Sequence, residues 1–230
     1  MTKLAIIPAR AGSKRLKNKN ILELAGKPLI CWTVDAAIES GLFSQILVST
    51  DSVHISHVIR NRYGATKCRV QLRPDELASD TASTSEVIRH HLVNTNYTDV
   101  CLLQPTSPLR VAGDIVSSFN VMKENVADCV VGVTQLRHPM EWSFNETAEF
   151  QGFLRSLGEK RSQDYIPRYI INGAIYWFTR RSFFEFGTHL NGNCALPFVM
   201  PAERSIDIDE NLDFLFAAAL LEKQQSPMVT

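Results

Sequence analysis

A basic loop near the N-terminus is the first part of the sequence whose residues suit chemistry. The stretch Ala9–Asn20 reads ARAGSKRLKNKN and holds five of the chain's 24 lysines and arginines, namely Arg10, Lys14, Arg15, Lys17 and Lys19. The small residues at positions 11–13 let backbone N–H groups face an anion, and the cations supply the charge that a triphosphate demands. Neither G-x-x-x-x-G-K-[ST] nor G-x-G-x-x-G is present. A solvated basic loop is the alternative, but the position after a predicted buried strand favours phosphate binding.

A pair of carboxylates lies near the other end of the chain. The stretch Ser205–Asp209 reads SIDID and alternates with the period of a strand. Asp207 and Asp209 are therefore predicted on one face, with the two isoleucines on the other. Adjacent carboxylates repel unless a cation lies between them, and such hard oxygen ligands favour Mg²⁺ or Mn²⁺ together with substrate phosphates. A solvated strand edge or a helix cap is the alternative, and the phosphate loop favours the metal site.

A third group of polar residues follows a predicted strand in the middle of the chain. The stretch Gln104–Arg110 has two prolines, which stiffen it, and it displays Gln104, Thr106, Ser107 and Arg110. Hydroxyl and amide groups on a rigid loop suit recognition of a polyhydroxylated ligand. A turn that caps the helix beginning near Val111 explains Ser107 and Pro108 equally well, so the pattern alone leaves both interpretations open.

Alternating strands and helices must position these three groups. The predicted strands are Lys3–Pro8, Gln45–Ser49, Cys68–Leu72, Asp99–Leu103, Asp128–Thr134, Ile171–Phe178 and Ala195–Met200. The predicted helices are Pro28–Ser40, Val53–Tyr63, Val87–Asn94 (after a capping box of Ser83 and Glu86), Val111–Asn125 and Asn211–Gln224. This alternation predicts an α/β fold, a mostly parallel sheet sandwiched by helices. Ligands bind such sheets at the carboxyl ends of the strands, where the polar residues after Pro8, Ser49 and Leu103 lie.

The stretch Gln135–Tyr169 breaks the alternation. It is polar, is interrupted by Gly152 and Gly158, and shows no clear helix or buried strand. We interpret it as an excursion from an otherwise single domain of residues 1–230, a hairpin arm that packs against a partner subunit.

Composition excludes several classes of protein. The 24 acidic residues balance the 24 basic ones, which argues against nucleic-acid binding through bulk charge. The longest apolar run, Phe214–Leu221, is far shorter than the roughly 20 residues of a membrane span, and Leu4–Ile7 is too short for the core of a signal peptide. The five cysteines form no CxxC pair, so we expect reduced, buried thiols in a cytoplasmic protein. The six histidines are expected at the surface or partly buried.

Several dispersed stretches resemble the N-acylneuraminate (sialic acid) cytidylyltransferases and follow that family's order. They are IPARAGSKRLKNKNI (Ile7–Ile21), VSTD (Val48–Asp51), LRPDELASDTAST (Leu72–Thr84), LLQPTSPLR (Leu102–Arg110), NGAIY (Asn172–Tyr176) and SIDIDENLDF (Ser205–Phe214). The resemblance implies a nucleotide-diphospho-sugar transferase-like fold and the conversion of CTP and a sialic acid to CMP-sialic acid and pyrophosphate. It also implies a homodimer formed through the Gln135–Tyr169 arm, and substrates that are CTP and a nine-carbon sugar acid.

The resemblance also implies roles for individual residues. Arg10, Ser13, Lys14 and Lys19 hold the triphosphate; Asn20, Arg73 and Thr84 lie near the cytidine; Gln104, Thr106, Ser107, Asn172 and Tyr176 face the sugar acid; Asp207 and Asp209 bind Mg²⁺. For an in-line displacement at the α-phosphorus, positioning and charge neutralisation are the main needs. Arg10 and Lys19 are then expected to neutralise the leaving pyrophosphate, and Asp209 is the candidate proton acceptor.

One position departs from the family pattern. Ile170 stands two residues before Asn172, where an arginine is usual in the family. An arginine there can touch the sugar's carboxylate or the partner subunit. We hypothesise that Arg161 or Arg168 substitutes for it, or that the preferred sugar acid differs.

Three other functions compete with the sialic acid enzyme. A cytidylyltransferase for legionaminate, pseudaminate or a Kdo-type sugar acid shares the whole layout. A metal-dependent glycosyltransferase also uses a DxD pair, but usually in mid-chain rather than close to the C-terminal end. A non-catalytic nucleotide-sensing module needs no combination of a triphosphate loop with a metal pair.

Overall fold

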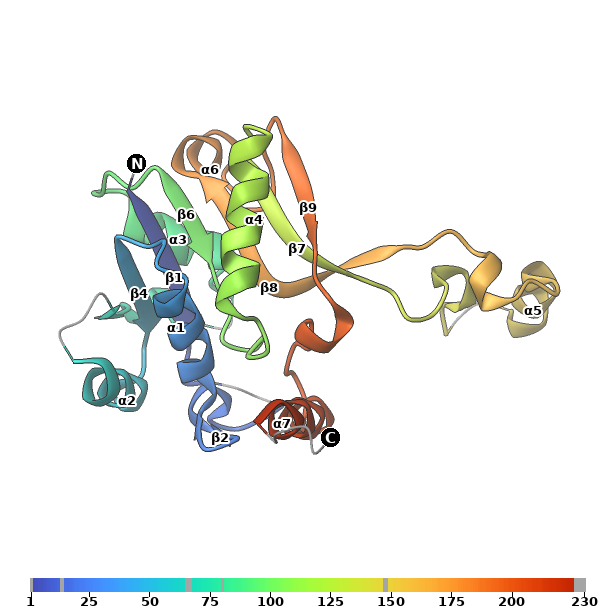
Figure 1. The fold of residues 1–230 in the computed structure, drawn as a ribbon, viewed down its shortest axis with the longest axis horizontal. Coiled ribbons are helices and arrows are strands. Elements are labelled where there is room, and N and C mark those ends of the chain that lie inside the picture. Colours follow the sequence, from blue (N-terminus) through green and yellow to red (C-terminus); the bar gives the residue numbers. More distant parts are fainter. Residues whose placement is uncertain (1, 13–14, 65–67, 80, 147–148, 226–230) are drawn as a thin grey trace.

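A twisted sheet runs through the centre of the computed structural model, which describes residues 2–12, 15–64, 68–79, 81–146 and 149–225 (Figure 1). Within these ranges the main sheet has the strand order β5-β4-β1-β6-β8-β7-β9. The strands are β1 (Lys3–Ala9), β4 (Gln45–Thr50), β5 (Cys68–Leu72), β6 (Asp99–Leu102), β7 (Cys129–Gln135), β8 (Tyr169–Thr179) and β9 (Ala195–Val199). Only β8 runs antiparallel to its neighbours among these strands, so the predicted mostly parallel sheet is confirmed.

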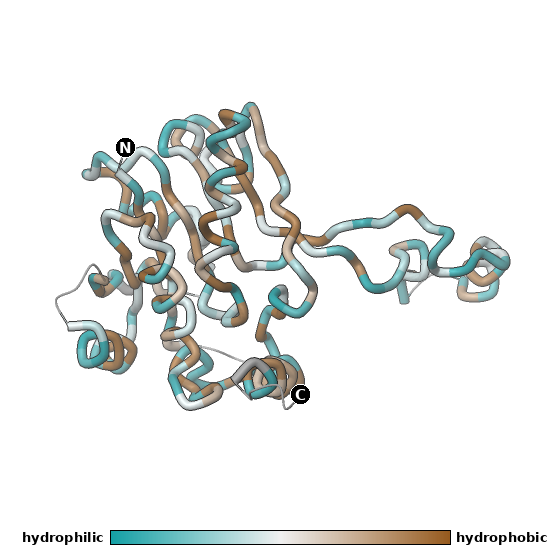
Figure 2. Tube along the Cα trace, viewed as in Figure 1, coloured by the Kyte–Doolittle hydropathy of each residue, from teal (hydrophilic) through white to brown (hydrophobic). Residues whose placement is uncertain are grey.

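Helices cover both faces of this sheet. They are α1 (Leu29–Glu39), α2 (Val53–Tyr63), α3 (Thr84–Leu92), α4 (Ala112–Glu124) and α6 (Arg180–Phe186). The helix α7 (Asn211–Gln225) packs beyond the end of the sheet against Leu24 and the start of α1, and α5 (Phe150–Leu157) lies outside the body. Buried residues of α1, α2 and α4 pack on one face of the sheet, and those of α3 and α6 pack on the other. Trp177 of β8 lies at the centre, where its ring stacks on Phe43 and contacts Phe119. Figure 2 shows hydrophobic residues along these central strands. The predicted α/β sandwich is confirmed.

Most predicted elements appear within two or three residues of their expected bounds. The capping box before α3 is present, because Glu86 N donates to Ser83 Oγ at 3.2 Å and Ser83 N donates to Glu86 Oε2 at 2.6 Å. The short helix α6 and a small ribbon of β2 (Glu23–Leu24) and β3 (Lys27–Pro28) were not predicted. Both are too short to leave a clear periodic pattern in the sequence.

The predicted strand over Ser205–Asp209 is wrong. The segment has no regular secondary structure and belongs to no sheet, and Ile208 N donates to Thr106 O at 2.8 Å. Ile208 is fully buried against α7 and the start of α1, and Ile206 packs against the same cluster. The alternation of SIDID therefore indicates which side chains face the core. It does not by itself predict a strand, because a strand also needs a neighbouring strand to pair with.

Between β7 and β8 the chain leaves the body and forms a long projection (Figure 1). This projection contains α5, so the expectation that Gln135–Tyr169 has no clear helix is wrong. Its aromatic residues form a small cluster, with the ring of Phe144 5.0 Å from those of both Phe150 and Phe153. Phe144 and Phe150 are each 51% exposed in a single chain. The projection therefore cannot bury these apolar side chains against its own residues.

The cysteines are free thiols, as expected. Four are buried, and Cys194 is partly exposed. Burial raises the pKa of Cys68 to about 12 and that of Cys129 to about 11, which keeps both thiols protonated and unreactive at neutral pH. None of the helices in the described ranges has the length and hydropathy that crossing a bilayer requires.

Two histidines differ from the expectation of surface or partly buried positions. His91 and His189 are buried, and burial lowers the pKa of each to about 4, with a further contribution from His90 and Arg73 for His91. His91 Nε2 lies 2.8 Å from Ser49 Oγ, and the ring of His189 packs edge-on against Tyr176. Both imidazoles are therefore neutral in the folded protein.

We expect the stability of the protein to fall as the pH drops below about 6.5, the usual pKa of an unfolded histidine. Between that pH and about 4 the unfolded chain binds protons at His91 and His189 that the folded protein does not bind, so acid favours unfolding. Each histidine contributes a slope of up to about 1.4 kcal/mol per pH unit. Urea titrations at pH 7 and pH 5 measure it. His189→Phe, which suits the aromatic surroundings, should roughly halve the histidine contribution, and an unchanged slope would contradict this assignment.

Candidate active site

The basic loop and the carboxylate pair share one cleft. This cleft has a volume of about 670 Å³ and lies at the carboxyl ends of β1 and β6. Of the residues predicted from the sequence, it is lined by Arg10, Lys19, Asn20, Arg73, Thr84, Gln104, Thr106, Asp207 and Asp209. The segments that carry them are up to about 200 positions apart in sequence, and the parallel sheet brings them together because its strands end at one edge.

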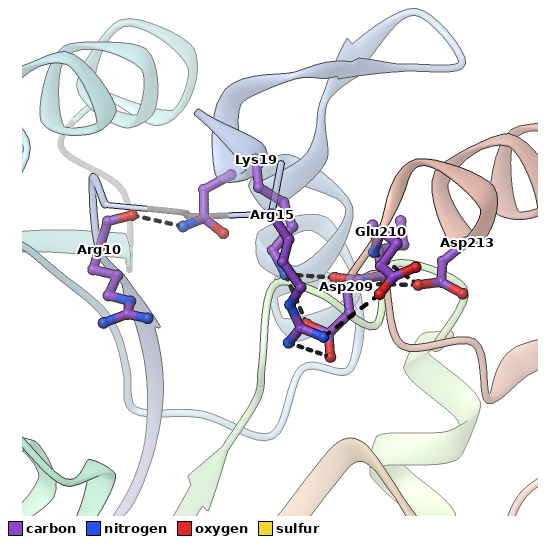
Figure 3. A network of polar contacts seen from close by, with 8 residues as sticks. Arg10, Arg15, Lys19, Asp209, Glu210 and Asp213 are labelled. Atoms are coloured by element: carbon purple, nitrogen blue, oxygen red, sulfur yellow. Dashed lines mark hydrogen bonds and ion pairs between the residues drawn. The ribbon is translucent and has the colours of Figure 1, made fainter. Parts of the chain in front are cut away.

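Asp209 connects the basic loop near the N-terminus to the carboxylate segment near the C-terminus (Figure 3). Lys19 Nζ donates to Ile208 O at 2.5 Å and to Asp209 Oδ1 at 3.2 Å, and Arg15 Nη2 lies 2.9 Å from Asp209 Oδ2. Asp213 accepts hydrogen bonds from the backbone N–H groups of Asp209 and Glu210, both at 2.9 Å, and so caps the start of α7. The carboxylate is therefore held from its backbone and from both of its oxygens.

Asp51, which ends the VSTD stretch after β4, positions the start of the basic loop. Its Oδ1 accepts a hydrogen bond from Ala11 N at 2.8 Å. Asn20 is buried and donates from Nδ2 to Arg10 O at 3.0 Å, which ties the end of the loop to its beginning. Asn20 thus has a structural role in addition to lining the cleft. Ser13 and Lys14, both predicted to hold the triphosphate, lie outside the described residues.

Arg73 is a buried cation with unused hydrogen-bond donors. Its side chain is 6% exposed, Nη1 donates to Leu77 O at 3.3 Å, and the carboxylate of Asp51 is 3.9 Å away. The Nε and Nη2 atoms have no hydrogen-bond partner. Burial lowers the pKa of Arg73, and Asp51 opposes this shift. Because buried donors are normally satisfied, these two nitrogens indicate a site for an acceptor supplied by a ligand.

Asp207 lines the cleft and is exposed to it. Partial removal of water by the surrounding protein raises the pKa of the Asp207 carboxyl; a hydrogen bond with Thr106 opposes the rise, and the charge of Asp209 adds to it. A Cβ atom at Gly173 would lie 3.2 Å from Asp207 Oδ2 and 3.0 Å from Gln104 Oε1, and Gly173 has a φ of +76°. Only glycine meets both conditions without strain. Gly173 is therefore required for the close approach of these two side chains.

The carboxylate pair fits a divalent cation. Asp207 and Asp209 are hard oxygen donors on one side of a cleft, and a cation between them would offset both the desolvation and the smaller repulsion by Asp209 that raise the pKa of Asp207. In the described part of the chain, no group of three or more His, Cys, Asp or Glu side chains could hold a metal. A divalent ion bound there would therefore take further ligands from water or from phosphate groups, as Mg²⁺ usually does.

An ion pair anchors the segment that carries the two aspartates. Arg204 Nη2 lies 2.9 Å from Asp114 Oδ1, and Arg204 Nε donates to Asp114 Oδ2 at 2.9 Å. Asp114 is buried at the start of α4, and it also accepts from Val111 N at 3.1 Å. Paired contacts between a planar guanidinium and a carboxylate fix direction as well as distance. The carboxylate segment is thus tied to the helix that follows the Gln104–Arg110 loop.

Two of the side chains expected on display in the Gln104–Arg110 loop point inward instead. Arg110 is buried, donates to Thr33 Oγ1 and Ser107 O at 2.9 Å each, and has its pKa lowered to about 10 by burial. Ser107 is fully buried beside Asn172 O. The physical reason is that a tight loop with two prolines cannot turn every polar group outward, and its backbone carbonyls need donors. Gln104 and Thr106 do line the cleft.

Asn172 and Tyr176, predicted to face the sugar acid, do not line this cleft. Asn172 is buried, donates to Ser205 Oγ at 2.9 Å and accepts from Ala174 N at 3.1 Å, so its amide supports the carboxylate segment. Tyr176 lies within the sheet, and burial, with a smaller contribution from Asp207, raises its pKa to about 12. In a single chain both residues support the site from behind rather than face it.

Sequence reasoning missed three further kinds of residue in or around the cleft. Neither spacing nor the family resemblance assigns a role to Arg15 of the basic loop or to Gly173 of the NGAIY stretch. Leu77, Ser79 and Val87 also line the cleft. Of these, only Arg15 carried a signal, because an extra cation in a phosphate loop is itself informative. The others depend on how the α3 region packs, which no local pattern specifies.

Comparison with known proteins adds an independent line of evidence. The sequence model of the family described as Cytidylyltransferase matches residues 4–151. The chain is 36% identical over 225 residues to an N-acylneuraminate cytidylyltransferase of Escherichia coli O18:K1:H7, covering 96% of this chain and 52% of that protein. It is 32% identical over 227 residues to a pseudaminic acid cytidylyltransferase of Campylobacter jejuni, with 96% of each covered. It therefore spans about half the length of the first relative and nearly all of the second.

A third relative is a CMP-N,N'-diacetyllegionaminic acid synthase of Legionella pneumophila, 34% identical over 237 residues, with 98% of this chain and 99% of that protein covered. Among solved structures, the CMP:2-keto-3-deoxy-manno-octonic acid synthetase complexed with CTP aligns with a TM-score of 0.72 at 15% identity, covering 97% of this chain and 100% of that one. At this identity the structural likeness concerns the fold alone.

Proposed function

The chain belongs to the cytidylyltransferase family, and from this premise we propose that it transfers CMP from CTP to the anomeric hydroxyl of a sialic acid, with release of pyrophosphate. One observation carries the proposal, namely that the cations of the basic loop and the two aspartates face each other in one cleft. A nucleotide triphosphate is the substrate whose charge matches the first group, and a divalent cation matches the second. The proposal concerns the chain as given, which spans half of its N-acylneuraminate relative.

The proposed reaction is a single in-line displacement. The anomeric oxygen forms a bond to the α-phosphorus of CTP, the bond from that phosphorus to the bridging oxygen breaks, and pyrophosphate leaves with the electron pair. Arg10 and Lys19 line the cleft and neutralise the leaving pyrophosphate. The proton of the attacking hydroxyl passes to Asp209, which stays the predicted acceptor. Gln104 and Thr106 lie beside Asp207 and orient the sugar acid.

Asp207 and Asp209 are proposed to hold Mg²⁺ or Mn²⁺. When bound, such an ion polarises the α-phosphoryl group and balances the charge that develops on it. The protein's contribution is the position of the two carboxylates, which Ile208 N and Asp213 fix from the backbone.

A pyrophosphate-release panel tests the proposed function. Enzyme, CTP and MgCl₂ are mixed with N-acetylneuraminate, legionaminate, pseudaminate or Kdo, and released pyrophosphate is measured for each. The expected result is release with N-acetylneuraminate at the highest kcat/KM. Highest release with another sugar acid would support the second candidate, a cytidylyltransferase for that acid, which the pseudaminic and legionaminic acid relatives favour. Consumption of a nucleotide-sugar instead, or CTP binding without turnover, would contradict both.

The position that lacks the usual arginine bears on this choice. Ile170 lies on β8 at the root of the projection, paired with Thr134 of β7, and is 52% exposed. Neither proposed replacement faces the cleft of the same chain, since Arg161 bonds to Asp164 at 3.1 Å and Arg168 bonds to Glu141 at 3.1 Å, all on the projection. Within one chain, therefore, neither arginine takes the place of the missing one, and the pyrophosphate panel decides whether the preferred sugar acid differs.

We expect Ile170→Arg to raise the preference for N-acetylneuraminate over the best alternative by about tenfold in kcat/KM, the effect of one charge-assisted hydrogen bond. The measurement is the same panel for wild type and variant. Ile171→Arg is the matched control, because Ile171 is equally exposed but its side chain points to the opposite face of the strand. Equal ratios in all three proteins would dismiss a role for this position in substrate choice.

We also propose that two copies associate through the projection. The exposed residues that would be covered are Met140, Trp142, Phe144, Phe150, Leu154 and Ile166. An exposed apolar cluster of this kind marks an interaction surface. Light scattering is expected to give twice the chain mass of 25.8 kDa. The double variant Phe144→Ser/Phe150→Ser should give the single mass, whereas Leu212→Ser, an exposed apolar residue on α7, should not. A single mass for the wild type would refute the association.

A further inference from the structure

Arg15 forms an ion pair with Asp209, one of the two carboxylates that the proposed metal needs. Its Nη2 atom lies 2.9 Å from Asp209 Oδ2, while Lys19 Nζ takes Asp209 Oδ1 at 3.2 Å (Figure 3). Both oxygens of this carboxylate are therefore engaged by cations of the phosphate loop. A divalent ion that binds Asp207 and Asp209 together must displace at least one of them.

The two cations differ in how easily they can leave. Lys19 has a side chain that is 12% exposed and is also bonded to Ile208 O, so its position is fixed by the backbone of the carboxylate segment. Arg15 has a side chain that is 60% exposed, and its other acidic neighbour, Glu210, is 4.0 Å away. Exposed ion pairs are weak because water and salt compete with them. Arg15 is therefore the cation that a divalent ion would displace from Asp209.

We propose that Arg15 is a positioning residue that changes partner as the substrates bind. In the nucleotide-free protein it neutralises Asp209; when the divalent ion takes Asp209, the guanidinium moves to the polyphosphate of CTP, the nearest anion in the same cleft. Arg15 lines that cleft together with Arg10 and Lys19, so its side chain already borders the space that the polyphosphate would fill. This inference rests on the proposed function.

A measurable consequence is coupling between metal and nucleotide. Metal binding frees a cation for CTP, and CTP removes the cation that competes with the metal, so each ligand raises the affinity for the other by the same factor. Without Arg15 the coupling should weaken, and the metal alone should bind more tightly. A fixed role for Arg15, such as simple attraction of phosphate, predicts no gain in affinity for the metal alone.

The test is a titration of nucleotide-free protein with Mn²⁺, followed by electron paramagnetic resonance of the free ion. We expect Arg15→Gln to bind Mn²⁺ about two- to fivefold more tightly than wild type, the range that an exposed ion pair allows. Lys17→Gln is the matched control, because it removes the same charge from an exposed position in the loop that does not line the cleft. A second titration with CTP present gives the coupling factor, expected to be smaller in Arg15→Gln than in wild type.

Equal Mn²⁺ affinity in Arg15→Gln and wild type, or an equal gain in Lys17→Gln, would overturn the inference. Absence of Mn²⁺ binding in every variant would overturn it as well, because no ion would then compete for Asp209. These outcomes are distinct from a failure of the proposed function, since the titrations need no sugar acid and no turnover. The pyrophosphate panel measures turnover separately.

Discussion

Asp209→Asn is expected to lower kcat/KM for pyrophosphate release by about a thousandfold or more, which corresponds to about 4 kcal/mol of transition-state stabilisation. The substitution keeps the shape of the side chain but removes the charge that the divalent ion needs, together with the proposed proton acceptor. Asp209 is the residue on which the two ends of the chain converge, through Lys19 and Arg15. Among the described contacts, none links the cations of the basic loop to the carboxylate pair more directly.

The fold should tolerate Asp209→Asn. The Asp209 side chain is 44% exposed, and exposed ion pairs contribute at most about 1 kcal/mol each to stability. Thermal unfolding is expected to change little. The control is Glu210→Gln, which removes a neighbouring charge that does not line the cleft and should keep most of the activity. Retention of wild-type activity in Asp209→Asn, with the fold intact, would refute the metal assignment.

Arg73→Met should weaken the binding of CTP without lowering the stability of the ligand-free protein. We expect the KM for CTP to rise by about 10- to 100-fold, since a hydrogen bond to a charged group contributes about 1.5–3 kcal/mol. The stability of the ligand-free protein should stay the same or increase. The reason is that Arg73 Nε and Nη2 are buried without hydrogen-bond partners, and a desolvated, unpaired donor costs free energy that methionine does not.

Steady-state kinetics with varied CTP and a urea titration without ligand check the two halves of this prediction. Arg69→Met is the matched control, because Arg69 is an exposed arginine on β5 that does not line the active-site cleft, and its loss should change neither quantity. If Arg73→Met unfolds more readily and binds CTP normally, Arg73 supports the structure and does not bind the nucleotide.

The order and type of most elements could be predicted from the sequence. The strands and the helices α1, α2 and α4 repeat their apolar residues with periods that local geometry requires, and Ser83 with Glu86 marks the start of α3 within the chain itself. The SIDID stretch shows where this reasoning stops. Its alternation correctly placed Asp207 and Asp209 on the cleft side, but the absence of a neighbouring strand could not be read from the segment alone.

Part of the candidate site could also be predicted from the sequence. Lys19, Arg73 and Gln104 follow strands or sit in motifs, and the cleft does bring them together. Ser107, Asn172 and Arg110 look identical to ligand-binding residues in sequence, yet their side chains form hydrogen bonds with nearby backbone groups. A polar side chain satisfies whichever partner packing places near it, and sequence spacing does not tell a substrate from a backbone carbonyl.

By itself, the sequence determined that this protein is an α/β sandwich with a cationic loop early and a carboxylate pair late, because period and residue type are local properties of the chain. Only the tertiary structure decided that Arg15 and Lys19 reach Asp209, that Gly173 lets Gln104 approach Asp207, and that Arg73 keeps two donors without partners. The physical reason is that such contacts join segments up to about 200 residues apart, and their distances depend on how strands stack and loops close, a property of the packed molecule rather than of any stretch of its chain.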